Sequence, residues 1–160
     1  MPRYRMRQKL ISIGDDYWIE DEAGQRVFRV DGKAFRLRKT FVLEDASGEK
    51  VAKIQERKLS VRDRMKIERP RGASATVRKA LVGVRDRFSI DVSDAPDLKA
   101  KGNIVDHEYE IKRDGDTIAT VSKRWFRVRD TYGVDIAAGE DAGLVLAITV
   151  CIEAMSRRAR

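Results

Sequence analysis

Hydrophobic and polar residues alternate with a period of two over most of the chain. The clearest examples are two runs of apolar residues that lie two positions apart: Phe88, Ile90 and Val92, and Tyr132, Val134 and Ile136. Side chains in a strand point to opposite faces in turn, so this pattern predicts strands with one buried and one solvent-facing side. Charged residues fill the polar positions, as at Arg64 and Lys66 beside Met65 and Ile67. An antiparallel sheet with one wet face is the expected result.

Short turn signals separate these runs. They lie at residues 21–24, 45–48, 70–72 and 113–115, and each contains a glycine. Glycine supplies the positive φ that tight turns need, so each segment predicts a β-hairpin tip. The segment Ser93–Gly102 is the one place where we expect a long loop. A long series of hairpins closes into a barrel or splits into a sandwich, because open sheet edges promote aggregation.

The C-terminal segment breaks the alternation and predicts a helix over residues 140–157. Ala142–Ile152 is uncharged, and its apolar residues cover every face of a helix. A helix that is apolar all round is buried on all sides. Eleven residues span roughly 17 Å at ~1.5 Å per residue, well short of a bilayer core. The pattern therefore favours a β-barrel around a buried central helix over a membrane span.

Four stretches and this helix carry a resemblance to a known family. They are YRMRQK at residues 4–9, DLKAKGNI at 97–104, IATVSKRW at 118–125 and DTYGVDI at 130–136. The sequence resembles the LURP-one-related proteins, a branch of the tubby-like superfamily that includes the phospholipid scramblases. The resemblance covers residues 1–160 as one domain. It implies a mainly β, tubby C-terminal-like fold: a closed antiparallel barrel of twelve strands, over about residues 3–137, around a central hydrophobic helix.

The same resemblance says less about function. Tubby domains bind phosphoinositides through basic residues on the barrel wall, and scramblases carry palmitoylated cysteines and a calcium-binding segment. This chain lacks the scramblase features, because its one cysteine lies inside the apolar helix and no EF-hand spacing occurs. The LURP-one-related branch has no settled molecular activity, so no site residue is carried over from it.

Positive charge is concentrated in the first half of the chain. The net charge is +8, and residues 1–80 hold 21 basic against 12 acidic side chains. Such a bias favours an anionic partner, because several cations on adjacent strands attract and grip phosphate. The candidate residues for an anionic or lipid-headgroup site lie on two predicted pairs of strands: Lys33, Arg36, Arg38, Lys39, Arg57, Lys58, Arg62 and Arg64.

The chain offers little material for catalysis. It has one His and one Cys, which argues against multi-cysteine metal sites and imidazole-based triads. We expect His107, between two acidic residues, to be an exposed imidazole at a strand edge, and Cys151 to be a buried, inert thiol. Carboxylates are expected mostly to face water beside basic residues. No phosphate-binding loop or nucleophile elbow occurs in the sequence. We therefore predict no enzymatic activity, catalytic residue, metal or cofactor.

The charge pattern predicts a non-enzymatic binding or scaffold module that recognises anionic phospholipid headgroups or another phosphorylated ligand through a basic barrel wall. The tubby-like resemblance implies headgroups of phosphoinositide type. Two alternatives remain open. One is nucleic-acid binding through the same patch, which the sequence pI of about 9.8 permits. The other is a protein-interaction barrel whose charge only aids solubility. The expected location is the cytoplasm, with peripheral association at a membrane, because no signal-peptide pattern follows the basic N-terminus.

Overall fold

The computed structural model describes residues 3–7, 17–33, 40–56, 64–79, 87–104, 106–125 and 131–158. Within them lie twelve strands and one helix. The strands are β1 (Arg3–Arg7), β2 (Tyr17–Glu20), β3 (Arg26–Lys33), β4 (Thr40–Asp45), β5 (Lys50–Glu56), β6 (Arg64–Glu68), β7 (Ala75–Lys79), β8 (Arg87–Val92), β9 (Leu98–Asn103), β10 (Glu108–Arg113), β11 (Asp116–Ser122) and β12 (Thr131–Ile136). The helix, α1, is Ala142–Arg158.

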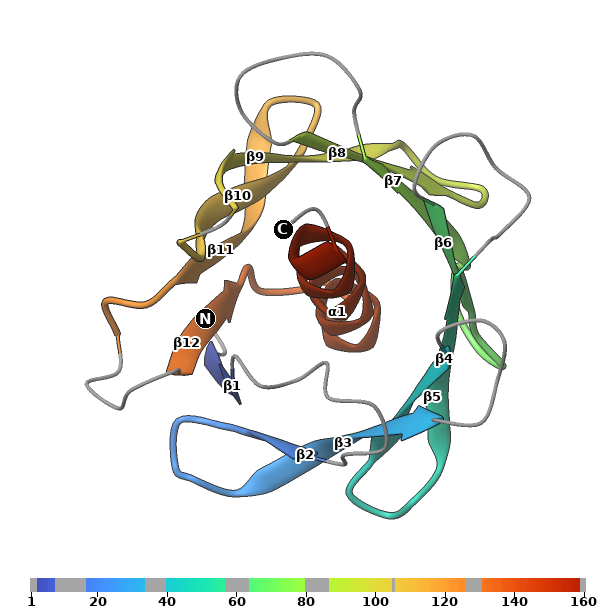
Figure 1. Cartoon of the computed structure of the whole chain (residues 1–160), viewed down its shortest axis with the longest axis vertical. Helices are drawn as coiled ribbons and strands as arrows, with labels where there is room; N and C mark the ends of the chain where they lie inside the picture. Colours follow the sequence, from blue (N-terminus) through green and yellow to red (C-terminus); the bar gives the residue numbers. More distant parts are fainter. Residues whose placement is uncertain are drawn as a thin grey trace.

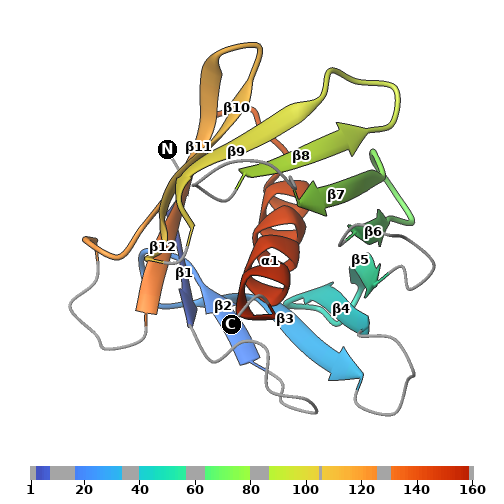
Figure 2. The ribbon, with the colours of Figure 1, turned by 45° about the horizontal axis from the view of Figure 1, so that its top comes forward.

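The strands form a closed barrel in which neighbours in sequence are neighbours in space. All pairs are antiparallel, and β1 pairs with β12 to close the ring. Helix α1 runs through the middle of this ring, as Figures 1 and 2 show. The predicted fold, a twelve-stranded barrel around a central hydrophobic helix, is confirmed. It satisfies both sequence patterns at once, because the inner face of every strand packs toward the apolar helix.

Alternation places the side chains as predicted. In β6, Met65 and Ile67 are buried, whereas Arg64 and Lys66 point outward. The helix residues from Leu144 to Met155 are all buried. Because the helix fills the barrel, its removal would expose the inner face of the strands at roughly 1.5–3 kcal/mol for each Leu, Ile or Val.

Aspartate and glycine build two of the predicted hairpin turns, those between β2 and β3 and between β4 and β5. Asp21 Oδ1 accepts hydrogen bonds from the backbone N–H groups of Ala23 and Gln25, each at 2.9 Å. Gly24 then takes a φ of +80°, which glycine adopts without steric cost. Asp45 and Gly48 repeat this construction in the next hairpin. Local chemistry therefore explains the turns predicted at residues 21–24 and 45–48.

One prediction is wrong. Ser93–Gly102 is not a long loop, because Leu98–Asn103 forms β9 and only a short turn precedes it. Leu98 and Ala100 face the core while Lys99 and Lys101 face outward. This alternation is short and built from residues with weak strand preference, so polar and turn-forming neighbours obscured it.

Candidate binding wall

The structure describes two of the eight residues predicted to bind an anion. Lys33 ends β3, and Arg64 begins β6 with a half-buried side chain. The other six lie outside the described residues: Arg36, Arg38, Lys39, Arg57, Lys58 and Arg62. The predicted eight-residue patch therefore stays a prediction. Arg64 is its one member whose surroundings can be examined.

Arg64 begins a row of polar residues that crosses five adjacent strands. In register, it lies opposite Arg78 of β7, and Arg78 lies opposite Ser89 of β8. Ser89 lies opposite Lys99 of β9, and Lys99 lies opposite Lys112 of β10. We call these five residues the basic row. They all sit on the outer face, because the residues that alternate with them point into the core.

A second like-charged pair lies beside the basic row. Arg87 of β8 is directly opposite Lys101 of β9, and both side chains are exposed. Together with the basic row, this pair makes up what we call the basic wall. Directly opposed like charges destabilise an antiparallel pair. The basic wall contains three such pairs, which a fold selected only for stability would not be expected to keep.

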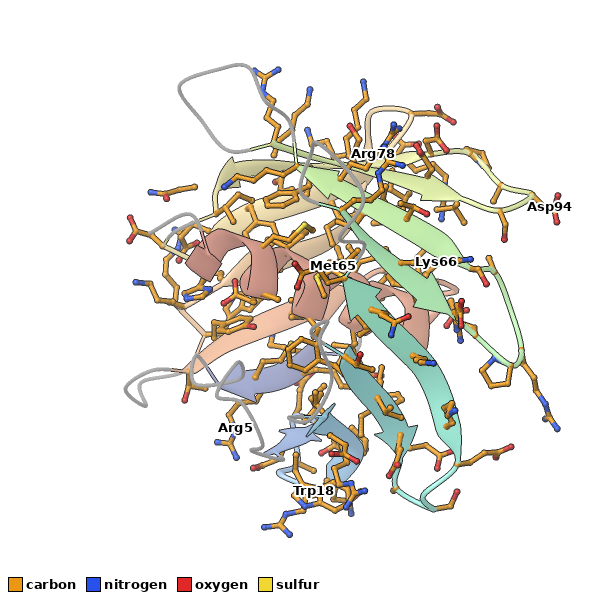
Figure 3. All side chains as sticks on the ribbon, turned by 45° about the vertical axis from the view of Figure 1, so that its right-hand side comes forward. Arg5, Trp18, Met65, Lys66, Arg78 and Asp94 are labelled. Carbon is orange, nitrogen blue, oxygen red and sulfur yellow. The ribbon has the colours of Figure 1, made fainter. Side chains whose placement is uncertain are left out.

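Carboxylates neutralise only part of the basic wall. Arg78 Nη2 lies 2.6 Å from Asp91 Oδ2, and Lys112 Nζ lies 3.4 Å from Glu110 Oε2. Among the described residues, no carboxylate lies within ion-pair distance of the other four cations: Arg64, Arg87, Lys99 and Lys101. Figure 3 shows Arg78 of β7 and Lys66 of β6 projecting from this side of the barrel.

The opposite side of the barrel follows a different rule. There, each of three arginines on the strands lies in register opposite a carboxylate. The pairs are Arg3 with Asp135 at 3.8 Å, Arg5 with Glu20, and Arg29 with Glu44 at 2.9 Å. The outer surface is therefore asymmetric. Balanced pairs run from β12 to β4, whereas three pairs from β6 to β10 set a basic residue opposite a basic residue, although Lys101 also lies opposite Glu110 on its other side. Sequence reasoning missed the basic row because strand register was not known and β9 was taken for a loop.

His107 is buried, which contradicts the prediction of an exposed imidazole. Only 4% of its surface is accessible. Its backbone has a φ of +54°, and its N–H donates to the carbonyl of Ile104 across a tight turn. The ring stacks on Tyr132 with centroids 4.4 Å apart and planes 6° apart. The left-handed turn directs the side chain into the barrel, where strand alternation alone would not have placed it.

Within the barrel, His107 meets the one carboxylate of the buried part of α1. His107 Nδ1 lies 3.0 Å from Glu153 Oε2, within ion-pair distance but without hydrogen-bond alignment. Glu153 is 2% exposed, so it is also an exception to the expectation that carboxylates face water. Tyr109 lies in the same cluster: burial, and then the charge of Glu153, raise the pKa of its phenol well above the usual value. The cluster therefore places the buried carboxylate of α1 beside an imidazole, where removing either partner would be costly.

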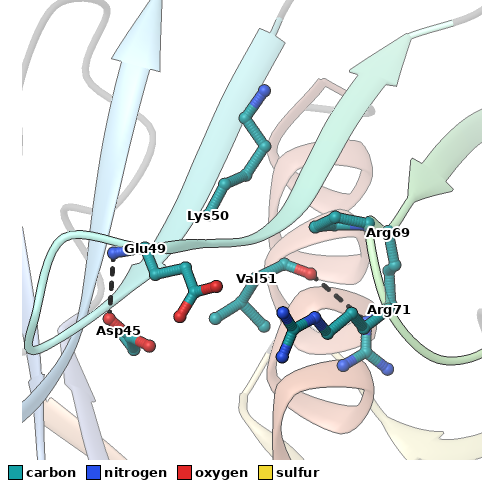
Figure 4. Close-up of a pocket in the computed structure, with 7 residues that line it drawn as sticks. Asp45, Glu49, Lys50, Val51, Arg69 and Arg71 are labelled. Carbon is teal, nitrogen blue, oxygen red and sulfur yellow. Dashed lines mark hydrogen bonds between the residues drawn. The ribbon is translucent and has the colours of Figure 1, made fainter.

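A pocket of about 180 Å³ lies near the start of α1 (Figure 4). The guanidinium of Arg69 lies on its wall, with Nη1 2.5 Å from Asp141 Oδ2 and Nε donating to the carbonyl of Val51 at 3.3 Å. Asp141 also caps α1 through the N–H of Leu144. Burial raises the pKa of Asp141, but the hydrogen bond from Arg69 and those from the backbone outweigh it, and the pKa is lowered. Asp141 is therefore the carboxylate that pairs with the Arg69 guanidinium, and this pair connects the start of α1 to the barrel wall.

The remaining candidate groups are inert or too few for a metal site. Cys151 is fully buried, and burial strongly raises the pKa of its thiol, as expected for a structural cysteine. Within the described residues, no three His, Cys, Asp or Glu side chains converge on a point where a metal ion could bind. No helix in the described part of the chain has the length and apolar character needed to cross a bilayer.

Comparison with known proteins identifies relatives of the whole barrel. A family model described as LURP-one-related matches residues 3–153. Among solved structures, the chain is similar to an X-ray structure of a protein from Arabidopsis thaliana. The two share 16% sequence identity and superpose with a TM-score of 0.69, over 98% of this chain and 92% of the other. This likeness concerns the fold. No curated protein matches the chain.

Proposed function

The chain belongs to the LURP-one-related family, and we propose its function from the geometry of its outer surface. We propose that the protein is a non-catalytic binding module that recognises anionic phospholipid headgroups, of phosphoinositide type, through the basic wall. The observation that carries this proposal is the register of β6 to β10, which sets basic residues opposite basic residues. A phosphorylated surface would supply the missing negative charge.

The interior of the barrel argues for an external ligand. The inner faces of the strands and the surface of α1 form one buried apolar cluster. A headgroup with several charges could not enter that cluster without a severe desolvation cost. Recognition on the outer face avoids this cost, because the Arg and Lys side chains there are exposed or half-buried and reach solvent.

The expected affinity is modest. Each basic residue near an anionic membrane contributes about 1 kcal/mol. The four cations without a described carboxylate partner, Arg64, Arg87, Lys99 and Lys101, would together supply about 4 kcal/mol, which corresponds to millimolar binding. Headgroups with several phosphates would increase this value, because a guanidinium binds phosphate with two parallel hydrogen bonds. The module is therefore expected to bind membranes reversibly.

Vesicle flotation tests this proposal. The purified protein is mixed with vesicles of phosphatidylcholine alone, or with added phosphatidylserine or phosphoinositide, at low and near-physiological salt. We expect binding that prefers phosphoinositide and persists at the higher salt. No binding to any vesicle would reject the proposal, and binding lost in salt would reduce it to diffuse attraction. A preference for oligonucleotide over vesicles would favour the nucleic-acid alternative.

Charge reversal locates the binding surface. The double variant Arg64→Glu/Arg87→Glu lowers the charge of the basic wall by four. The matched control, Lys50→Glu/Arg71→Glu, makes the same change at exposed residues beside the pocket near the start of α1. We expect the first variant to lose flotation and the control to retain most of it. Equal losses would show that total charge, and not the basic wall, governs binding.

A further inference from the structure

The middle of the basic row has the composition of a phosphate site. Ser89 lies between Arg78 on one neighbouring strand and Lys99 on the other. Its hydroxyl makes no hydrogen bond with any described side chain. Adjacent strands are about 4.8 Å apart, so the two cations start about 10 Å from each other with the hydroxyl midway between them. This gap can accommodate one tetrahedral phosphate group.

We propose that Ser89, Arg78 and Lys99 form a phosphate-binding subsite on the outer face of β7 to β9. The Ser89 hydroxyl donates to one phosphate oxygen. The Arg78 guanidinium and the Lys99 ammonium donate to the others from either side. Arg64 extends the subsite along the row beyond Arg78, where a second phosphate of the same headgroup would bind. This inference rests on the proposed function and names its point of contact.

Asp91 shapes the subsite from one side. Its carboxylate holds Arg78 Nη2 at 2.6 Å, which leaves the Nη1 group without a described partner. A guanidinium positioned at one nitrogen loses less side-chain freedom when a ligand binds at another. The carboxylate also reduces the local positive charge. Diffuse electrostatic attraction then contributes less to the binding free energy, and directed hydrogen bonds from Ser89 and Arg78 contribute more.

Substitutions that conserve charge separate this subsite from diffuse attraction. Ser89→Ala removes the hydroxyl, and Arg78→Lys keeps the positive charge but removes the forked donor. The probes are inositol trisphosphate, measured by calorimetry, and vesicles that contain phosphatidylserine or phosphoinositide at equal total charge. We expect each variant to bind the trisphosphate and the phosphoinositide vesicle about tenfold more weakly, the effect of losing one charge-assisted hydrogen bond. Binding to phosphatidylserine vesicles should stay within twofold of the parent.

The chain supplies a matched control for the lost hydroxyl. Thr120 of β11 is also half-buried on the outer wall, but it lies in register between Glu110 and Asp135. Thr120→Ala should leave all binding unchanged. Ser89→Thr, which keeps a hydroxyl and suits a strand, should restore binding and shows that the loss in Ser89→Ala is not a folding defect.

The outcomes distinguish the subsite from the proposed function. If the parent binds phosphoinositide vesicles while Ser89→Ala and Arg78→Lys bind as tightly as the parent, the subsite is refuted and the basic wall stands. If the parent binds neither the vesicles nor the trisphosphate, the subsite and the proposed function are both refuted. If the parent binds vesicles but not the trisphosphate, the subsite is refuted as a headgroup site, because its chemistry does not require a membrane.

Discussion

The pair of His107 and Glu153 makes the sharpest prediction about stability. The two side chains are 4% and 2% exposed and lie 3.0 Å apart, inside a core that is mainly apolar. Removing one member of a buried pair costs more when the residue left behind is charged. His107→Asn, which tolerates the left-handed backbone of this turn, leaves the Glu153 carboxylate buried without its imidazole. We expect a loss of about 3–5 kcal/mol in the free energy of unfolding.

The reverse substitution should cost less. Glu153→Leu leaves the imidazole as one unsatisfied polar group in the core, at a cost of about 1–3 kcal/mol. The double variant should be more stable than the sum of the single effects predicts, by about 0.5–3 kcal/mol. Thr149→Val is a control on the same helix, because its hydroxyl bonds only to the carbonyl of Val145, one turn earlier in α1. It should cost about 1 kcal/mol or less.

Urea unfolding measures these differences. Fluorescence of the two tryptophans, Trp18 and Trp125, reports the transition. The free energy of unfolding of each variant is compared with that of the parent, using one common slope of this free energy against urea concentration. Two results would refute the reasoning: additive effects of the two substitutions, or His107→Asn with the stability of the parent. Either would show that the carboxylate and the imidazole do not stabilise each other in the core.

Three further predictions concern pH and backbone. The pKa of Asp141 is lowered from 3.8, so its contribution to stability is present above about pH 4 and is lost as pH falls through the lower folded-state value. Asp141→Asn keeps a helix-capping side chain but loses the charge paired with Arg69, so it should cost about 1 kcal/mol or less at neutral pH in urea unfolding. This difference should close in acid, and a difference that persists there would contradict the reasoning. The pKa of Tyr109 is raised by burial and by Glu153, so the folded state loses stability as pH rises above about 10. Tyr109→Phe should therefore unfold at a higher pH than the parent in an alkaline titration. Identical unfolding curves for the variant and the parent would contradict this. Gly102 has a φ of +136°, and a Cβ there would lie 2.7 Å from a backbone oxygen of β10. Gly102→Ala should therefore lower the free energy of unfolding by about 1–3 kcal/mol. An unchanged midpoint of thermal unfolding would contradict this.

The sequence predicted the fold well because its two periodicities are local properties. The period-two runs identified strands such as β8 and β12, and the apolar run identified α1. Only a barrel around a helix buries both. The strand Leu98–Asn103 was missed because its inward residues are few and its neighbours are typical of turns.

The candidate site could be predicted only in its general character. Excess positive charge indicated an anionic partner, but which residues meet depends on strand register. Arg78 and Lys99 are 21 positions apart and come within reach of one ligand only because both pair with Ser89. The burial of His107 depends on one left-handed backbone position, which alternation does not encode. Glu153 was hidden because it follows the uncharged run and precedes a basic end.

Flotation of the parent and of Arg64→Glu/Arg87→Glu with phosphoinositide vesicles, at near-physiological salt, tests the central claim most directly. The account predicts that the parent floats with the vesicles and that the variant stays in the unbound fraction. The variant should be at least as stable to unfolding as the parent, because each new glutamate lies opposite a cation. A parent that stays unbound, or a folded variant that floats like the parent, would contradict it.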